Sequence, residues 1–276
     1  MKNIWVPLSG AIAQQTNVET IANNVANANT PGFKRDQMIF KEHLTALEKG
    51  YDEIDLPHKE WRPSDFYRSY GAEHAHVKAE ASFTDFTQGQ MVPTGNPLDL
   101  AIHGKGFFEV LTPNGIRFTR AGALSLSSDG KLVTTQGFPV LSPYTSGDQS
   151  GGEGLQDIDP SARAIQVIPG KISINLQGEV FSNNQKISDL SIVEFKDPNA
   201  LRKEGSALFI NKDNGNRLEK ADKTVVHQGF IEQSNVNAVN EMSNLIKANR
   251  HFESIQKVIK AYDNMAGKSV NEISRF

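Results

Sequence analysis

The stretch from Leu245 to Tyr262 reads LIKANRHFESIQKVIKAY, and its apolar residues recur at alternating spacings of three and four. This is the a and d pattern of a helix that buries one narrow seam against a second helix. The pattern continues towards the end of the chain, so the predicted helix spans roughly 55–60 Å at 1.5 Å per residue. A helix of this length needs a partner to pack against. The expected seam residues here are Leu245, Ala248, Phe252, Ile255, Ile259 and Tyr262, and a second stripe is formed by Met242, Ile246, Val258 and Met265.

The matching segment lies at the opposite end of the chain, from Asn3 to Asn29. Its three-four repeat predicts a second helix, which the sequence Thr30-Pro31-Gly32 ends because proline disfavours a helical conformation in the residue before it. Lys2 and Glu19 are the only charged residues among the first 30, whereas a surface helix in water usually carries a charged face. The expected seam residues of this helix are Ile4, Leu8, Ala11, Val18, Ala22 and Val25.

Two interpretations of these stripes are open. On pattern alone, a helix pair that closes a globular domain is the more frequent use of apolar stripes. The alternative is an assembly surface, which the near absence of charge on the N-terminal helix favours.

Between the helices the hydrophobic period changes to two, which predicts short strands. Asn114-Gly115 and Asp129-Gly130 supply the positive φ that tight hairpin turns need. The prediction is an α+β fold, with long N- and C-terminal helices paired as a coiled coil and a central all-β domain of short antiparallel strands. The expected division is a discontinuous helical assembly domain (1–35 and 229–276), extended connectors (36–78 and 198–228) and a central β domain (79–197) with a Gly-rich insertion at 145–162. Within the first connector, residues 36–48 are expected to form a short helix.

Composition narrows the function classes. The chain has 276 residues and a net charge of -3, so no strong field indicates nucleic acid or anionic lipid. The absence of cysteine excludes disulfides and thiolate metal sites. We find no apolar run of spanning length, no cleavable signal peptide and no catalytic, cofactor or metal motif. The expectation is a protein that is not an enzyme, has no small-molecule substrate and does not insert into a membrane.

Six segments resemble the flagellar basal-body rod and hook proteins. They are ANNVANANTPGFKR (residues 22–35), GNPLDLAIHGKGFF (95–108), FTRAG (118–122), SDGKLV (128–133), SNVNAVNEM (234–242) and NRHFE (249–253). The matches are long, stand in the family's order and cover most of the chain. The residues that carry the resemblance are Asn24, Asn27, Thr30, Gly32, Phe33, Gly95, Asn96, Asp99, Gly106, Phe107, Asn235, Asn237, Arg250 and Glu253.

The resemblance implies a structural subunit of the bacterial flagellar rod, more similar to the proximal than to the distal type, whose terminal helices form the inner layer of a tubular polymer. It implies copies of this chain and other rod and hook proteins as partners, and export by the flagellar type III apparatus to a periplasmic basal body. One alternative is a distal rod or hook role within the same family. The other is a globular β enzyme or carbohydrate-binding module with the terminal helices as its lid.

Overall fold

The computed structural model describes residues 5–44, 75–144, 159–168, 170–205, 207–218 and 224–273. Ile4, the connector residues 45–74 and most of the Gly-rich segment lie outside these ranges. The chain forms two units: unit 1 comprises Met1–Val25, Asp36–Phe83 and Ala238–Phe276, and unit 2 comprises Ala26–Arg35 and Thr84–Asn237. Unit 2 therefore contains residues 26–35 and 198–237, which the expected division placed in the helical domain and the connectors.

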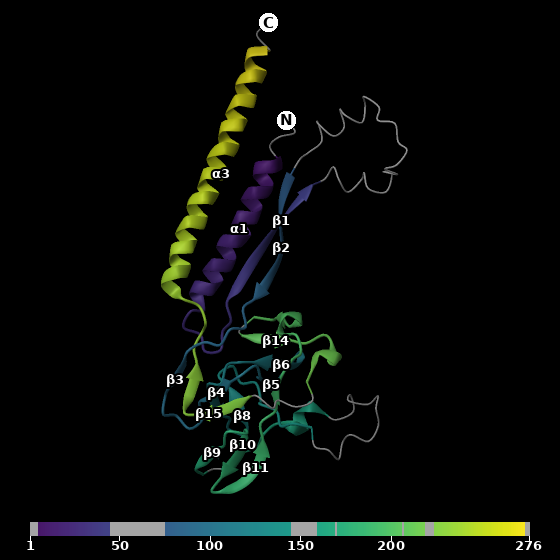
Figure 1. Cartoon of the computed structure of the whole chain (residues 1–276), viewed down its shortest axis with the longest axis vertical. Coiled ribbons are helices and arrows are strands. Elements are labelled where there is room, and N and C mark those ends of the chain that lie inside the picture. Colours follow the sequence, from purple (N-terminus) through teal and green to yellow (C-terminus); the bar gives the residue numbers. More distant parts are fainter. Residues whose placement is uncertain are drawn as a thin grey trace, which may run out of the picture. The chain divides into compact units, whose positions relative to one another are not determined.

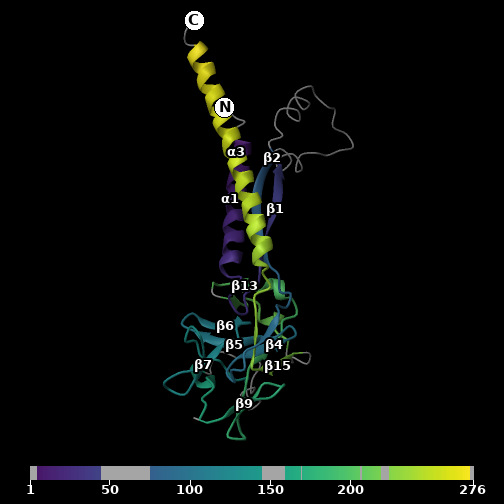
Figure 2. The same ribbon diagram turned by 90° about the vertical axis from the view of Figure 1, so that its left-hand side faces the viewer.

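The described part of unit 1 includes the helices α1 (Trp5–Ala26) and α3 (Ala238–Ile273). They lie side by side and run in opposite directions (Figures 1 and 2). The Gln14 side chain on α1 donates a hydrogen bond of 3.2 Å to the backbone carbonyl of Ala248 on α3. Gly10 lies against α3 at Ile255, because a Cβ there would stand 3.9 Å from the Ile255 Cδ1. Both predicted terminal helices are thus confirmed.

Strands β1 (Asp36–Leu44) and β2 (Ala75–Thr84) form a two-stranded sheet. The short helix expected over residues 36–48 was therefore wrong for residues 36–44, and residues 45–48 lie outside the described ranges. Met38, Ile39 and Phe40 are consecutive apolar residues, and such a short apolar run fits a strand as well as a helix until a second strand pairs with it. In unit 1 the backbone N–H of Val77 on β2 donates to the Ser9 hydroxyl on α1.

Unit 2 is built from short antiparallel strands. A five-stranded sheet has the order β12-β5-β6-β14-β13, a three-stranded sheet has the order β11-β10-β9, and three two-stranded sheets pair β15 with β4, β16 with β3 and β7 with β8. The strands are β3 (Met91–Pro93), β4 (Leu100–His103), β5 (Phe107–Thr112), β6 (Gly115–Thr119), β7 (Leu124–Leu126), β8 (Leu132–Thr134), β9 (Ile172–Ile174), β10 (Glu179–Ser182), β11 (Gln185–Asp189), β12 (Ile192–Val193), β13 (Arg202–Lys203), β14 (Leu208–Ile210), β15 (Val225–Gln228) and β16 (Phe230–Glu232). The described residues between them include the 3-10 turns η3 (Pro160–Arg163), η4 (Pro198–Ala200) and η5 (Asn214–Asn216). The α+β class is confirmed.

The hairpins form where the turn residues predicted them. Gly115 between β5 and β6 has φ +102°, and Gly130 between β7 and β8 has φ +74°. Two buried apolar clusters fill unit 2. The larger is centred on Ile102, Phe108 and Val110, and the smaller contains phenylalanine rings in edge-to-face contact.

Candidate functional site: a buried polar network and an exposed helix surface

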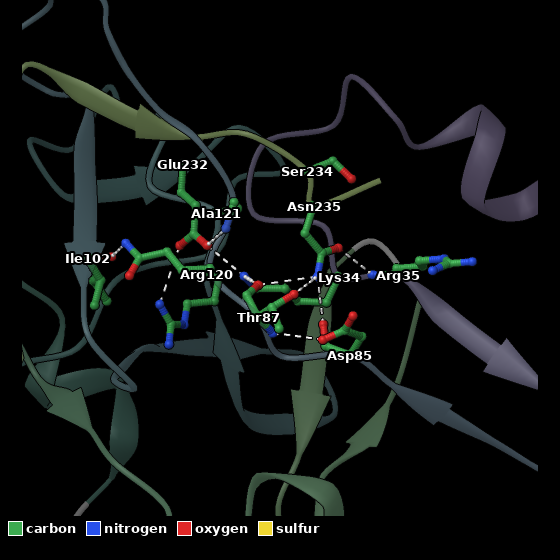
Figure 3. A network of polar contacts seen from close by, with 12 residues as sticks. Lys34, Arg35, Asp85, Thr87, Ile102, Arg120, Ala121, Glu232, Ser234 and Asn235 are labelled. Atoms are coloured by element: carbon green, nitrogen blue, oxygen red, sulfur yellow. Dashed lines mark hydrogen bonds and ion pairs between the residues drawn. The ribbon is translucent and has the colours of Figure 1, made fainter. Parts of the chain in front are cut away.

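Three charged side chains meet in the interior of unit 2 (Figure 3). The ammonium of Lys34 donates to one oxygen of Glu232 at 2.6 Å, and the side chains of both residues are fully buried. The guanidinium of Arg120 donates to the other oxygen of Glu232 at 3.3 Å. Backbone groups complete the set, because Gly89 N–H donates to Glu232 and Lys34 also donates to the carbonyl of Thr87. Burial without such partners would cost several kcal/mol per charge, to order of magnitude.

The side chain of Asn235 extends this network. Its Oδ1 accepts the N–H of Arg35 at 2.8 Å, and its Nδ2 donates to the carbonyls of Asp85 at 2.8 Å and Thr87 at 3.2 Å. The N–H of Asp85 in turn donates to the carbonyl of Arg35 at 2.8 Å. One amide thus satisfies backbone groups of two different segments, which a side chain with one donor and one acceptor end can do.

Glycines permit the close approach of these segments. A Cβ on Gly89 would stand 1.9 Å from the carbonyl oxygen of Gln233. A Cβ on Gly32 would stand 2.3 Å from the backbone nitrogen of Ala121, and Gly32 also has φ +70°. Any larger residue at either position forces backbone to move.

Burial lowers the pKa of Lys34 from its usual value, and the attraction of Glu232 opposes this shift only in part. The pKa of Arg120 is lowered for the same reason. Both carboxylate oxygens of Glu232 are occupied by donors, so the group is not free to bind a substrate or transfer a proton. The geometry is that of a structural element.

A second buried ion pair lies elsewhere in unit 2. Arg163 donates to Glu109 at 2.7 and 3.3 Å, and Ser191 donates to the same carboxylate. The Arg163 guanidinium also stacks on the ring of Tyr144, 3.7 Å from its centroid. This pair provides a comparison of similar chemistry for the network around Lys34.

In unit 1 Asn24 has a role like that of Asn235. Its side chain donates to the carbonyl of Asp36 at 2.8 Å and accepts the N–H of the same residue at 3.0 Å. Asn24 is 1% exposed. Its buried amide bonds both backbone groups of Asp36, the first residue of β1, as a neighbouring strand would.

Exposed apolar side chains gather in unit 1. Among the described residues, only three of the exposed large hydrophobic side chains belong to unit 2, namely Leu126, Ile168 and Leu176. The others are Val6, Leu8, Ile12, Ile39, Phe40, Val77, Phe83, Val239, Met242, Ile246, Val258, Tyr262 and Met265. Such concentration of exposed apolar surface is typical of an interaction surface.

The residues expected in the helix seam differ in burial. On α1, Ala11 is buried, Val18 and Val25 are half-buried, and Leu8 and Ala22 are exposed. On α3, Ala248 is buried, Leu245, Phe252, Ile255 and Ile259 are half-buried, and Tyr262 is 44% exposed. Gly10 of α1 lies against Ile255 of α3, and the two antiparallel helices have the same rise per residue. Trp5, the first residue of α1, therefore lies opposite about residue 260 of α3. Tyr262 lies beyond that point.

The remaining residues that carry the family resemblance shape turns, support the core or lie on the surface. Asn96 caps the turn before β4, because its side chain donates to Asp99 and accepts the N–H of Leu98. Also in unit 2, the Oδ1 of Asn27 accepts a hydrogen bond from the Thr30 hydroxyl, and the Lys203 ammonium lies over the ring of Phe33. Gly95 has φ +73°. Gly106 and Phe107 are buried, and Asn237 is exposed. Arg250 and Glu253 are exposed on α3.

Sequence reasoning did not single out the charges of the buried network. Lys34 lies inside a quoted segment, but its partner Glu232 is 198 residues away along the chain, and Arg120, the other cation bound to Glu232, is 86 residues away from Lys34. The available signal is weak: Glu232 follows the apolar pair Phe230-Ile231 in a strand. The described part of the chain contains no group of three or more metal-ligating side chains and no helix long and apolar enough to cross a membrane.

Comparisons with known proteins agree across the chain. Family models match at residues 6–34 (Flagella basal body rod protein), 101–182 (Flagellar hook protein FlgE/F/G D1 domain) and 227–273 (Flagellar basal body rod FlgEFG protein C-terminal). The chain is 32% identical to the flagellar basal-body rod protein FlgF of Caulobacter vibrioides, over 99% of this chain and 96% of that protein. It is 31% identical to the FlgG proteins of Borreliella burgdorferi and of Buchnera aphidicola subsp. Acyrthosiphon pisum, over 96% or more of each chain. The chain therefore belongs to the flagellar basal-body rod protein family.

Proposed function

We propose that this protein is a structural subunit of the bacterial flagellar rod and assembles into the axial tube through its terminal helices. The observation that carries the proposal is the concentration of exposed apolar side chains in unit 1, in a chain that matches rod proteins over nearly its full length. No bond is made or broken. Contacts between helices of adjacent subunits transmit torque towards the hook.

The pairing of α1 and α3 as a coiled coil is part of this proposal. The hydrogen bond from Gln14 to Ala248 and the contact of Gly10 with Ile255 support it. The half-buried residues Phe252 and Ile259 continue the same a/d stripe of α3 on either side of Ile255.

The exposed apolar side chains of α3 lie on two sides of that seam. At about 100° per residue, Val239, Met242 and Ile246 project to one flank of the stripe, and Val258 and Met265 project to the other. A helix with apolar surface on two flanks suits a subunit that has neighbours on two sides. A contact that does not close on itself then extends into a tube.

We infer that copies of this chain and other rod and hook proteins are its neighbours in the basal body, and that it reaches the periplasm by flagellar type III export. Within the rod we propose the proximal position. The C-terminal segments SNVNAVNEM and NRHFE support this choice through their resemblance to the proximal type.

Deletion of the gene followed by electron microscopy of detergent-extracted basal bodies tests the function. The proposal expects rings that carry a missing or truncated rod and no hook, and a proximal subunit should leave the shortest stub. A complete rod that lacks only its hook would place the protein further out. Intact, rotating flagella in a strain without a second copy of the gene would refute the proposal.

A further inference from the structure

The chain passes between the two units four times. The passages lie between residues 25 and 26, 35 and 36, 83 and 84, and 237 and 238. A relative movement of the two units acts on the chain at these four points. How firmly unit 2 holds the three segments that lead to these passages therefore decides how stiffly the units are coupled.

The buried network holds the segments at all four passages together on the unit 2 side. Residues 26–35 contribute Lys34 and Arg35 and connect two passages, residues 84–89 contribute Asp85 and Thr87, and residues 229–237 contribute Glu232 and Asn235. Figure 3 shows the side chain of Asn235 directed towards Arg35, Asp85 and Thr87. No segment is attached to only one other, because each bonds to both of the remaining two.

Backbone hydrogen bonds reinforce these links. Gly32 N–H donates to the carbonyl of Glu232 at 2.8 Å, Asp85 N–H to that of Arg35 at 2.8 Å, and Gln233 N–H to that of Gln90 at 2.9 Å. The glycines at positions 32 and 89 allow the segments to come this close. Since the Lys34 and Glu232 side chains are fully buried, displacement of one segment exposes or unpairs charges of the others.

We propose that this network is a junction that makes the four chain passages move as one, so that force on the terminal helices reaches the β unit without local unfolding of any single segment. We name it the junction network; it consists of Lys34, Arg35, Asp85, Thr87, Gly89, Arg120, Glu232 and Asn235. The transmission of force rests on the proposed role in the rod. The cooperative opening of the segments is independent of that role.

A simpler explanation is that the network only stabilises unit 2. The Glu109–Arg163 pair provides the matched control, because it too is a buried ion pair in unit 2 but belongs to none of the three segments. Glu109→Gln removes one charge from a buried pair, as Glu232→Gln does. A purely stabilising role predicts the same behaviour for both variants.

Hydrogen exchange of the full-length chain tests the physical claim. Asn235→Ala removes the bonds of one side chain and leaves the buried charges in place, so it is the milder variant if Glu232→Gln does not fold. We expect the backbone N–H groups of Asp85, Gly32 and Gln233 to exchange faster, although none of these N–H groups bonds to the Asn235 side chain. The expected increase is about tenfold for each, which corresponds to the loss of one net hydrogen bond. Glu109→Gln should leave these amides unchanged. Faster exchange at Arg35 alone, the direct partner of Asn235, would overturn the inference.

Swimming under load tests the mechanical consequence. Cells that carry Asn235→Ala should assemble flagella and swim in dilute buffer, but lose hook-filaments into the medium as viscosity rises, at least about tenfold more than wild type, whereas Glu109→Gln cells should not. Equal shedding by both variants would overturn the mechanical inference. If deletion of the gene leaves flagella intact, the proposed function fails instead, and the exchange result still decides whether the junction exists.

Discussion

At the scale of single residues, the Lys34 ammonium depends on the carboxylate that reaches it from near the other end of the chain. Removing Glu232 takes away the carboxylate with which the buried charges of both Lys34 and Arg120 form their ion pairs. Glu232→Gln should therefore lower the free energy of unfolding by about 3–5 kcal/mol, the typical cost of breaking a buried pair. Urea denaturation followed by circular dichroism measures this loss.

The surface pair Glu179–Lys186 is the control for this variant. Both side chains are partly exposed, so water replaces the lost partner and Glu179→Gln should have little effect. A loss of stability in Glu232→Gln no larger than that in Glu179→Gln would contradict the argument.

The lowered pKa of Lys34 also gives a pH dependence. Between the folded pKa and the usual 10.5, the unfolded chain binds a proton at Lys34 that the folded chain does not. Stability rises with pH wherever the unfolded state binds more protons. Compared with Lys34→Met, the wild-type chain should gain stability as the pH rises towards 10.5. The quantity to follow is the free energy of unfolding of the wild-type chain minus that of Lys34→Met. If this quantity stays constant or falls as the pH rises over this range, the folded pKa of Lys34 is not lowered.

Alanine substitution at Gly89 and at Gly95 compares two different reasons for a glycine: close packing at Gly89 and a left-handed backbone conformation at Gly95. Alanine at Gly89 would meet the Gln233 carbonyl oxygen at 1.9 Å, so the segment before β3 and the segment after β16 must move apart. Gly95 has φ +73° and open space around it, so alanine there adds only the strain of a left-handed conformation, roughly 1–2 kcal/mol. Gly89→Ala should lower the unfolding midpoint in urea more than Gly95→Ala does. The reverse order would mean that the segments are not closely packed at Gly89.

At the scale of elements, local signals predicted the parts of the fold that depend on neighbouring residues. The three-four repeat predicted α3, and Asn-Gly and Asp-Gly predicted the β5–β6 and β7–β8 hairpins. Strand β1 was missed because its partner β2 starts 39 residues after β1 begins, and a nine-residue segment alone fits either a helix or a strand. Asn24 and Asn235 were identified from a family resemblance, but their bonds to backbone could not be predicted, since the bonded segments meet only in the folded chain.

The seam of α3 gives the prediction at this scale. Ile255→Asp with Ile259→Asp places two carboxylates among half-buried apolar residues four apart, which should prevent helix pairing and abolish swimming. Extracted basal bodies should lack a complete rod. The control is Ser254→Asp with Lys257→Asp, because both residues are exposed on the same helix. Normal swimming of the seam variant would contradict the assignment of these residues to the seam.

At the scale of the whole molecule, the chain separates two kinds of surface. Among the described residues, unit 2 buries apolar side chains in clusters of its own, whereas in unit 1 most of the large apolar side chains are exposed on α1, α3 and the β1–β2 sheet. A unit that does not bury its own apolar surface obtains stability from partners. This difference predicts that assembly and folding are coupled in unit 1 and independent in unit 2.

Circular dichroism of the purified chain at increasing concentration measures that coupling. We expect the helical signal to be weak in dilute monomer and to grow on polymerisation, because ordering a long helix costs conformational entropy that only buried apolar surface offsets. The β unit should keep its signal throughout, and Glu109→Gln should not change the concentration at which helix appears. A lid on a globular domain would behave differently, since its helices would be fully formed at every concentration. Full helicity in dilute monomer would therefore reject coupled folding and favour the lid.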